Sequence, residues 1–319
     1  MARNAPLTLA LCGMLSLDII IPAFNAERVL GSTLEAIYEQ TLPVAINLGV
    51  IVVNNRSVDG TADVIAQWAA KGVRLIDEDS IQGRSAACNA GVQASSADYV
   101  LILDADCRLA GKGALQLICD VMNKGVGAGF GYASAATDDF WGRYYRSLEA
   151  GRRRAGWQGF TTACCLIRRE LFTAVGGFST EYQHYGFEDR DFVCRLKVHE
   201  ADAAIIALPE LRVIHDDETS VPEICEKMYT SGRYSGGIFK RNFPDAYLAS
   251  GYARVDLDTA PGYMAMALRI LQPLQPLFAR LAEYLARRRQ MPLAIGRPLL
   301  RLCSALSYFR GTVDRARDR

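Results

Sequence analysis

The sequence predicts an α/β fold built on a mostly parallel sheet with helices on both faces. Three observations support this prediction. Short apolar runs alternate with segments of helical periodicity as far as residue 103. These runs are apolar at consecutive rather than alternate positions, which is typical of strands buried on both faces. Half of the 319 residues are apolar, so the chain has the material for a large core.

Four strands and three helices are expected in the first half of the chain. The β-branched run before Pro22 predicts the first strand, and Gly72 is a plausible helix stop. The expected strands cover residues 17–21, 50–53, 73–76 and 99–103, and the expected helices cover residues 27–40, 61–70 and 84–93. Ligands of such sheets bind beyond the carboxyl ends of the strands, so functional residues are expected directly after each strand.

The second half is less regular. A glycine-rich stretch at 125–132 precedes further expected elements, which are helices at 140–148 and 188–197 and strands at 162–167, 203–208 and 211–214. After Pro261 the apolar spacing stays helical but four prolines interrupt it. We therefore expect an N-terminal extension over 1–16, a main domain over 17–260 with halves 17–107 and 108–260, and a helical tail over 261–319.

Composition and charge exclude several classes of protein. Lys and Arg number 36 against 35 Asp and Glu, so no global charge favours a nucleic-acid partner. The nine cysteines are irregularly spaced without a Cys-x-x-Cys pair, which favours free thiols in a reducing cytoplasm. No apolar run reaches the ~18–20 residues of a membrane-spanning helix. The apolar stretch at 7–15 lacks an obvious cleavage site, so no secretory signal is expected.

The best candidate site is the Asp104-Ala105-Asp106 sequence. Two carboxylates at the end of a buried strand are able to hold a hard divalent cation such as Mn²⁺ or Mg²⁺. Such a cation bridges and neutralises a diphosphate leaving group. The same spacing recurs at 77/79, 189/191 and 256/258, but only 104/106 follows an uninterrupted apolar strand. No glycine-rich dinucleotide motif or P-loop is present, so a nucleotide must be held another way.

A second group of carboxylates opens the helix expected at 188–197. Acids at a helix start can simply complement the helix dipole. Alternatively, one of them deprotonates an acceptor hydroxyl as a general base. Asp191 lies two residues further along the helix than Asp189, so it should face elsewhere and matter less.

Together these segments resemble glycosyltransferase family 2, whose members have the GT-A fold. The resemblance covers about 200 residues, from Leu17 to Asp217, and rests on five motifs in order. They are LDIIIPAFNAE at 17–27, VIVVNNRSVDGTADVI at 50–65, GRSAACNAG at 83–91, YVLILDADC at 99–107, and GGF at 176–178 followed by GFEDRDFVCRL at 186–196.

The resemblance implies a Rossmann-like, mostly parallel sheet flanked by helices, with a nucleotide-sugar half, an acceptor half and a C-terminal helical extension. It implies a catalytic role for Asp189 as base and for Glu188 in holding the acceptor. Asp104 would face the ribose or metal, and Asp106 the metal and diphosphate. The implied base and ribose pocket consists of Pro22, Phe24, Glu27, Asn55 and Arg84.

Two departures from the family pattern concern the nucleotide. Asn54-Asn55 stands where two aspartates are frequent, although an Asn amide still both accepts and donates hydrogen bonds. Ala87 stands where an Arg often precedes the Asn, and Arg84 is a candidate for that cation. Two later residues are further candidates: His215 is either a metal ligand or a structural residue, and Arg233 either contacts the diphosphate or belongs to an ordinary surface loop.

The resemblance implies an inverting glycosyltransferase that moves a sugar from a nucleotide-diphosphate donor, a UDP-sugar first of all, to an acceptor hydroxyl. A carbohydrate or lipid-linked acceptor and a role in surface polysaccharide or glycolipid assembly are expected. The alternatives are a nucleotidyltransferase and a non-catalytic nucleotide-sugar-binding subunit. From Tyr263 onwards 11 Arg accompany 3 acidic residues, so the tail is expected to contact an anionic membrane at its cytoplasmic face, the domain or a second copy.

Overall fold

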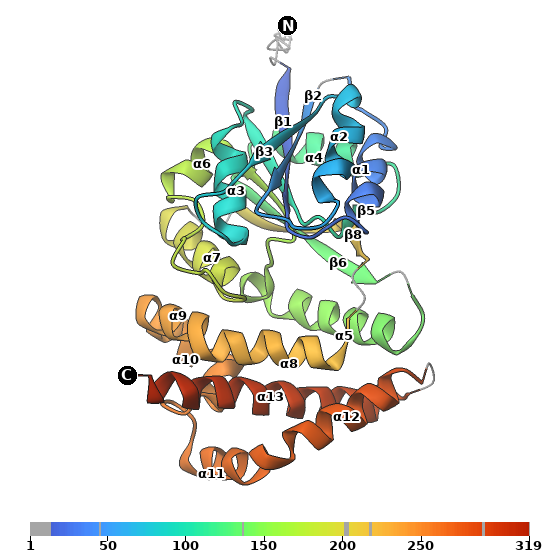
Figure 1. Cartoon of the computed structure of the whole chain (residues 1–319). Helices are drawn as coiled ribbons and strands as arrows, with labels where there is room; N and C mark the ends of the chain where they lie inside the picture. Colours follow the sequence, from blue (N-terminus) through green and yellow to red (C-terminus); the bar gives the residue numbers. More distant parts are fainter. Residues whose placement is uncertain are drawn as a thin grey trace, which may run out of the picture.

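The computed structural model describes residues 14–44, 46–135, 137–200, 204–216, 219–288 and 291–318. A single sheet of eight strands, in the order β3-β2-β1-β4-β7-β6-β8-β5, forms the centre of one part, and a layer of helices forms the other (Figure 1). Most of the N-terminal extension expected over 1–16 lies outside the described residues, and the first strand already begins at residue 15.

The first half of the chain forms the parallel part of the sheet, as expected. Its strands are β1 (Leu15–Ala23), β2 (Ile46–Asn54), β3 (Val73–Asp77) and β4 (Tyr99–Leu103). The helices are α1 (Leu30–Tyr38), α2 (Thr61–Trp68) with the 3-10 turn η1 (Ala69–Lys71), and α3 (Arg84–Gln93). Gly72 ends η1 at φ 88°, a left-handed conformation that glycine adopts without strain.

The strands are buried on both faces, because successive side chains point to opposite sides of the sheet. In β1, Ile19 and Ile21 belong to the core under α1, α2 and α4 (Ala114–Asn123), whereas Ile20 belongs to the core under α3. Gly91 of α3 lies where a Cβ would come within 2.3 Å of Ile20 Cγ2, so only glycine allows α3 to pack this closely. The consecutive apolar residues that predicted the sheet therefore serve two separate cores.

The second half completes the sheet with strands of both directions. β7 (Cys164–Arg168) runs antiparallel to β4 and to β6 (Ala128–Ala135), and β5 (Cys107–Leu109) runs antiparallel to β8 (Ile205–His215). β6 and β8 are parallel. The helices of this half are α5 (Phe140–Arg154), η2 (Gly156–Gly159), α6 (Arg169–Ala174) and α7 (Glu188–His199).

The sequence predicted no element for one segment of this half and was wrong about another. The glycine-rich stretch at 125–132 contributes most of β6, where a Cβ on Gly131 would lie 2.8 Å from a carbonyl oxygen of β8. The separate strands expected at 203–208 and 211–214 are one strand, β8, whose pairing with β6 shifts register between Phe130 and Tyr132. The irregularity that suggested two strands is a bulge, which local periodicity does not distinguish from a strand end.

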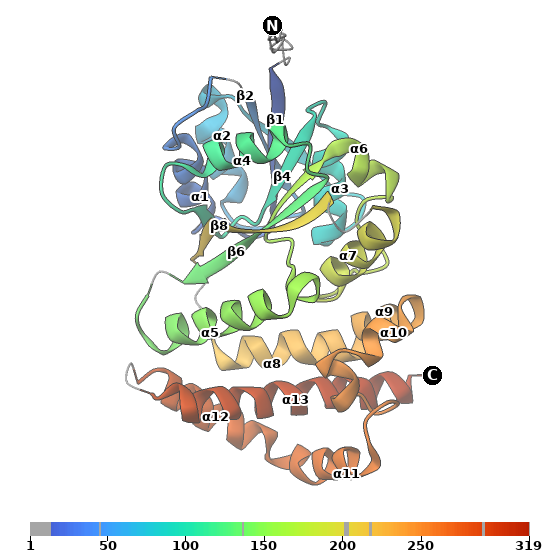
Figure 2. The same ribbon diagram turned by 180° about the vertical axis from the view of Figure 1, so that it is seen from behind.

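The helical layer begins before the expected boundary at residue 260. It contains α8 (Val221–Thr230), η4 (Ser231–Ser235), α9 (Gly236–Asn242), α10 (Pro244–Leu248), η5 (Gly251–Val255), α11 (Gly262–Leu271), η6 (Gln272–Leu274), α12 (Gln275–Ala286) and α13 (Leu293–Arg317). Helices from both sides of residue 260 pack together in shared cores. The expected division between a main domain over 17–260 and a tail over 261–319 stays a prediction. α8 and α13 lie between the sheet and α11–α12 in both views (Figures 1 and 2).

A buried ion pair fastens α13 to this layer. Asp256 is fully buried, and both of its carboxylate oxygens accept hydrogen bonds from Arg315 Nη2, at 3.1 and 2.9 Å. Tyr247 donates to the same carboxylate, and Lys240 lies 3.4 Å from it. The Asp-x-Asp spacing at 256/258 therefore belongs to a buried ion-pair cluster in the helical layer. Within the described residues no helix is long and apolar enough to cross a membrane.

Candidate active site

The site lies at the edge of the sheet where the parallel strands end, facing the helical layer (Figure 1). Asp104 and Asp106 follow β4 in the turn before β5. β8 ends at His215, which is paired in register with Cys107 of β5. The antiparallel β5–β8 pair thus carries a residue from late in the sequence to the Asp-x-Asp turn, a contact that strand prediction alone did not establish.

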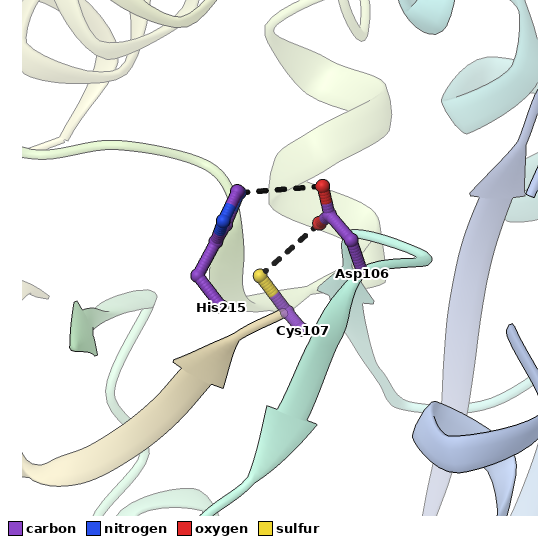
Figure 3. Close-up of side chains that lie close together, drawn as sticks. All are labelled: Asp106, Cys107 and His215. Atoms are coloured by element: carbon purple, nitrogen blue, oxygen red, sulfur yellow. Dashed lines mark hydrogen bonds and ion pairs between the residues drawn. The ribbon is translucent and has the colours of Figure 1, made fainter. Parts of the chain in front are cut away.

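Asp106, Cys107 and His215 bring three potential metal-ligating atoms within 4.8 Å of one another (Figure 3). Asp106 Oδ2 is 3.3 Å from His215 Nε2, and Asp106 Oδ1 is 3.5 Å from Cys107 Sγ. Burial, reinforced by Asp104 and Asp106, raises the pKa of the Cys107 thiol well above its usual value. A protonated thiol is a poor ligand. The carboxylate and imidazole that remain suit Mn²⁺ or Mg²⁺ and leave coordination positions for a diphosphate.

His215 is surrounded by residues that the sequence patterns did not select. The ring of Tyr145, on α5, lies 6.2 Å from the His215 ring, and its hydroxyl is 2.5 Å from Thr219 Oγ1. The next residue, Asp216, is paired with Arg108 and its backbone N–H donates to the Asp106 carbonyl oxygen. The aromatic cluster at the start of α5 was the available signal for Tyr145, whereas no pattern marked Arg108.

Arg84 and Asp104 form the second part of the site. Asp104 Oδ1 accepts hydrogen bonds from Arg84 Nε and Nη2, at 2.9 and 2.7 Å. Arg84 also donates to the hydroxyl and the carbonyl oxygen of Thr162, just before β7. Burial lowers the pKa of Arg84, but the combined attraction of Asp104 and its other negative neighbours, Glu188 among them, outweighs burial and raises this pKa well above its usual value. Arg84 therefore keeps a positive charge at this edge.

The expected nucleotide loop is organised by two of its own polar side chains. Asn55 is buried; its amide donates to the carbonyl oxygens of Glu78 and Ile81, and its oxygen accepts from Gly83 N at 2.7 Å. Asn55 thus shapes the 78–83 loop with both amide hydrogens. The exposed Glu27 carboxylate accepts from Gly60 N at 3.1 Å. Of the remaining residues expected in this pocket, Pro22 is half-buried in β1 and Phe24 follows the strand with half its surface exposed.

A strained turn presents the carboxylates of α7. Gly186 and Phe187 both have positive φ, 98° and 72°, and for Phe187 this conformation carries a steric cost. The Phe187 side chain is buried against Phe239, Tyr252 and Tyr308, so the helical layer maintains the turn. Glu188 and Asp189 follow as the first two residues of α7.

Glu188 faces Arg84 and Asp104. Its Oε2 atom is buried and has no hydrogen-bond partner among the described residues. Burial and the neighbouring Asp189 raise the pKa of Glu188 to about 7, against the lowering influence of Arg84. Carboxyl groups whose pKa is raised in this way cluster at functional sites.

We expect the Glu188→Gln variant to be more stable than the wild type at alkaline pH. Folding raises the pKa of Glu188, so the stabilisation from its bound proton is present at low pH and is lost as pH rises through 7. The advantage of Glu188→Gln should grow by about 2–3 kcal/mol between about pH 5 and pH 8. Denaturant unfolding in EDTA measures it, and parallel pH profiles of the two proteins would contradict the assigned environment.

Asp191 turns away from this site, as its position in the helix predicted, but it has a structural role. Its buried carboxylate accepts from Arg195 Nε at 2.6 Å and from the Tyr182 hydroxyl at 3.1 Å. Arg195 in turn donates to the carbonyl oxygens of Val175 and Gly177. The expectation that replacing Asp191 has little effect therefore applies to catalysis and not to stability. Breaking a buried ion pair costs about 3–5 kcal/mol of folding free energy.

Among the described residues, no hydrogen bond or ion pair links the Arg233 side chain to Asp104, Asp106 or the other acids of the site. Arg233 Nη1 donates to the Tyr229 hydroxyl at 2.7 Å and Nη2 to Asp318 at 3.0 Å, both inside the helical layer. Its predicted contact with a diphosphate has no support from these bonds.

The GGF segment at 176–178 is held by Asn89 of α3, whose side-chain amide exchanges hydrogen bonds with the backbone of Phe178.

Two family models match the chain. Glycosyl transferase family 2 matches residues 18–176, and the N-terminal domain of galactosyltransferase matches residues 142–214. The 4,4'-diaponeurosporenoate glycosyltransferase of Staphylococcus aureus is 36% identical over 105 residues, which are 32% of this chain and 27% of that protein. The chain thus spans under a third of the length of the curated relatives it matches.

Solved structures resemble the whole described fold. A mannosyltransferase from Pyrobaculum calidifontis, PcManGT, in complex with GDP-Man and Mn²⁺ aligns with a TM-score of 0.62 at 21% identity, covering 95% of this chain and 87% of that one. Residues 1–349 of Staphylococcus aureus TarS in complex with UDP-GlcNAc align with a TM-score of 0.51 at 14% identity, covering 95% and 92%. The predicted GT-A fold is confirmed by this likeness.

Proposed function

The chain belongs to glycosyl transferase family 2, and from that premise we propose that it is an inverting glycosyltransferase acting on a nucleotide-diphosphate sugar. One observation carries the proposal: the Arg84–Asp104 pair, the Asp106–His215 pair and Glu188 with Asp189 converge on one edge of the sheet. A nucleotidyltransferase would usually need a glycine-rich basic loop after β1, where this chain has Pro22-Ala23-Phe24-Asn25. The acids at 104/106 and 188/189 also argue against a non-catalytic binding subunit.

The donor is proposed to bind along the ends of β1, β2 and β4. Pro22, Phe24 and Glu27 would line the nucleoside pocket, with the exposed Phe24 ring available for stacking. Asn55 would act through the 78–83 loop that it holds. We propose a UDP-sugar first and a GDP-sugar as the other candidate, since the structural relatives include complexes with each nucleotide.

The chemistry is proposed to rest on three groups. Asp189 accepts the proton of the acceptor hydroxyl as its oxygen attacks the anomeric carbon from the face opposite the diphosphate. Glu188 holds the acceptor, and Arg84 keeps positive charge beside Asp104. Asp106 and His215 would hold Mn²⁺ or Mg²⁺, which supplies charge neutralisation for the departing nucleoside diphosphate. Fixed positions for donor and acceptor make the displacement effectively unimolecular.

The acceptor is proposed to be a carbohydrate or a lipid-linked hydroxyl in surface polysaccharide or glycolipid assembly. We propose a cytoplasmic protein that associates peripherally with the inner face of the cytoplasmic membrane. The arginine-rich tail supports this location, because basic residues near an anionic lipid surface each favour binding.

A thermal-shift screen of UDP, GDP and ADP with and without Mn²⁺ tests the donor class. A nucleotide at 100 times its dissociation constant stabilises a protein by about 2.7 kcal/mol. We expect stabilisation by UDP or GDP that increases with Mn²⁺, and hydrolysis of the matching nucleotide sugar in the absence of acceptor. Stabilisation by a nucleoside diphosphate without any turnover would favour the non-catalytic alternative.

A further inference from the structure

Folding leaves one row of large apolar side chains exposed on the outermost helices. These residues lie along α11, η6 and α12, at the end of the molecule that is farthest from the sheet (Figures 1 and 2). Between 45% and 75% of each residue is exposed. We call this row the apolar stripe; it consists of Tyr263, Met266, Ile270, Leu274, Leu277, Leu281 and Tyr284.

The stripe is one face of a continuous helical pattern. Its members are spaced three or four residues apart, so within α11 and within α12 they share one side of the helix. The opposite face supplies Leu268, Ala282 and Ala286, which are buried in cores shared with α13. The packing of α11 and α12 within the chain is thus complete without the stripe, which needs a partner outside the fold.

Positive charge accompanies the stripe. Arg269 on α11 and Arg280 and Arg287 on and directly after α12 are all exposed, and Arg280 and Arg287, seven residues apart, share one side of that helix. Between residues 262 and 288 the sequence has a single acid, Glu283. Its carboxylate accepts from Val221 N at 2.9 Å and from Arg287 Nε at 2.8 Å, so it is committed to the protein's own packing.

A basic groove borders the stripe at the bend between α11 and α12. This groove, of about 680 Å³, lies between the bend and the C-terminal half of α13. Arg269, Arg310 and Arg317 line it together with one acid, Asp314. It is large enough for a phosphate group and carries a charge of matching sign, directly beside apolar side chains.

We propose that the stripe docks the protein on an anionic lipid bilayer, with the seven apolar side chains at the acyl boundary and the arginines among the phosphate headgroups. An apolar helix face flanked by basic residues is the pattern of interfacial helices, and tyrosines at both ends suit the headgroup level. A second copy is disfavoured as occupant, because residues 262–288 would offer its arginines only one acid, Glu283, whose carboxylate already accepts from Val221 and Arg287.

Docking through α11–α12 sets the orientation of the active site. The helical layer separates the bilayer from the sheet, and the site edge faces that layer (Figure 1). A soluble acceptor would gain nothing from this orientation, whereas an acceptor anchored in the same bilayer is confined near the site. The docked state therefore favours the lipid-linked acceptor. This consequence rests on the proposed function; the docking specifies the surface for the membrane association proposed above and does not depend on catalysis.

Flotation of the full chain with vesicles tests the proposal. We expect binding to phosphatidylglycerol–phosphatidylcholine vesicles at low salt and much weaker binding to phosphatidylcholine alone. The single variants Arg269→Gln and Arg280→Gln should each reduce vesicle binding about fivefold, which corresponds to about 1 kcal/mol per basic residue. Ile270→Glu with Leu277→Glu should abolish it. Val198→Glu, at an apolar residue on α7 that is still more exposed than Ile270 and Leu277, is the control and should bind as the wild type does.

Two further measurements make the outcome decisive. Asp106→Ala should still bind vesicles, so loss of enzymatic function and loss of docking are separable. Light scattering should show that the wild type and the Ile270→Glu, Leu277→Glu protein have the same size. A wild-type dimer that this pair dissociates, or a wild type that ignores anionic vesicles at low salt, overturns the proposal.

Discussion

Replacing Asp189 with Asn is expected to lower turnover by about 10²–10⁴-fold, the usual contribution of a general base. The amide keeps the shape of the side chain and its hydrogen bond to the backbone N–H of Arg190, at 2.7 Å, but loses the basic carboxylate. Affinity for the nucleotide diphosphate should stay unchanged, because the proposed donor contacts lie on β1, β2 and β4. Single-turnover kinetics and nucleotide titration measure the two quantities separately.

The control for this variant must be an acid that is not part of the fold. Glu181→Gln meets that condition, because its exposed carboxylate pairs only with Arg241 among the described residues. Asp191→Asn does not, since it should lower thermal stability by breaking the buried pair with Arg195. Product stereochemistry is the stronger test: an α-linked donor should give a β-linked product. Retention, or wild-type turnover by Asp189→Asn, would falsify the role of Asp189 as base.

Replacing Asp106 with Ala is expected to abolish transfer and to remove the Mn²⁺-dependent part of nucleotide-diphosphate binding. Asp106 is the carboxylate that faces His215, and the nearby Cys107 thiol is held in its protonated form by burial. The variant therefore retains only an imidazole of the proposed ligand set. Calorimetric titration of the nucleotide with and without Mn²⁺ should show a single, metal-independent affinity.

Asp258→Ala provides the comparison for Asp106. It belongs to the same residue spacing, but its carboxylate lies 2.6 Å from Lys240 in the helical layer, and Lys240 keeps Asp256 as a second partner. Activity and metal dependence should remain close to those of the wild type. Equal losses in the two variants would mean that position after a buried strand does not distinguish a metal site from a structural acid.

Local sequence patterns predicted the parallel half of the fold well. β4 and α3 have the expected limits, because an uninterrupted apolar run and a glycine-led helix are each defined by neighbours in the chain. The same patterns missed α4 and β5 and divided β8 in two. β5 is only three residues long, and the bulge in β8 exists only through its pairing with β6.

The sequence by itself determined which residue types stand after each strand, and so the chemistry available at the sheet edge. Only the tertiary structure decided how they are used. It paired His215 with Asp106 across β5 and β8, turned Asn55 into the support of a loop, assigned Asp191 to a buried ion pair and Arg233 to the helical layer. It also left one apolar face of α11–α12 uncovered. The reason is physical: strand and helix periodicities are properties of neighbours in the chain, whereas ligand sets, ion pairs and exposed surface depend on contacts between residues far apart in sequence.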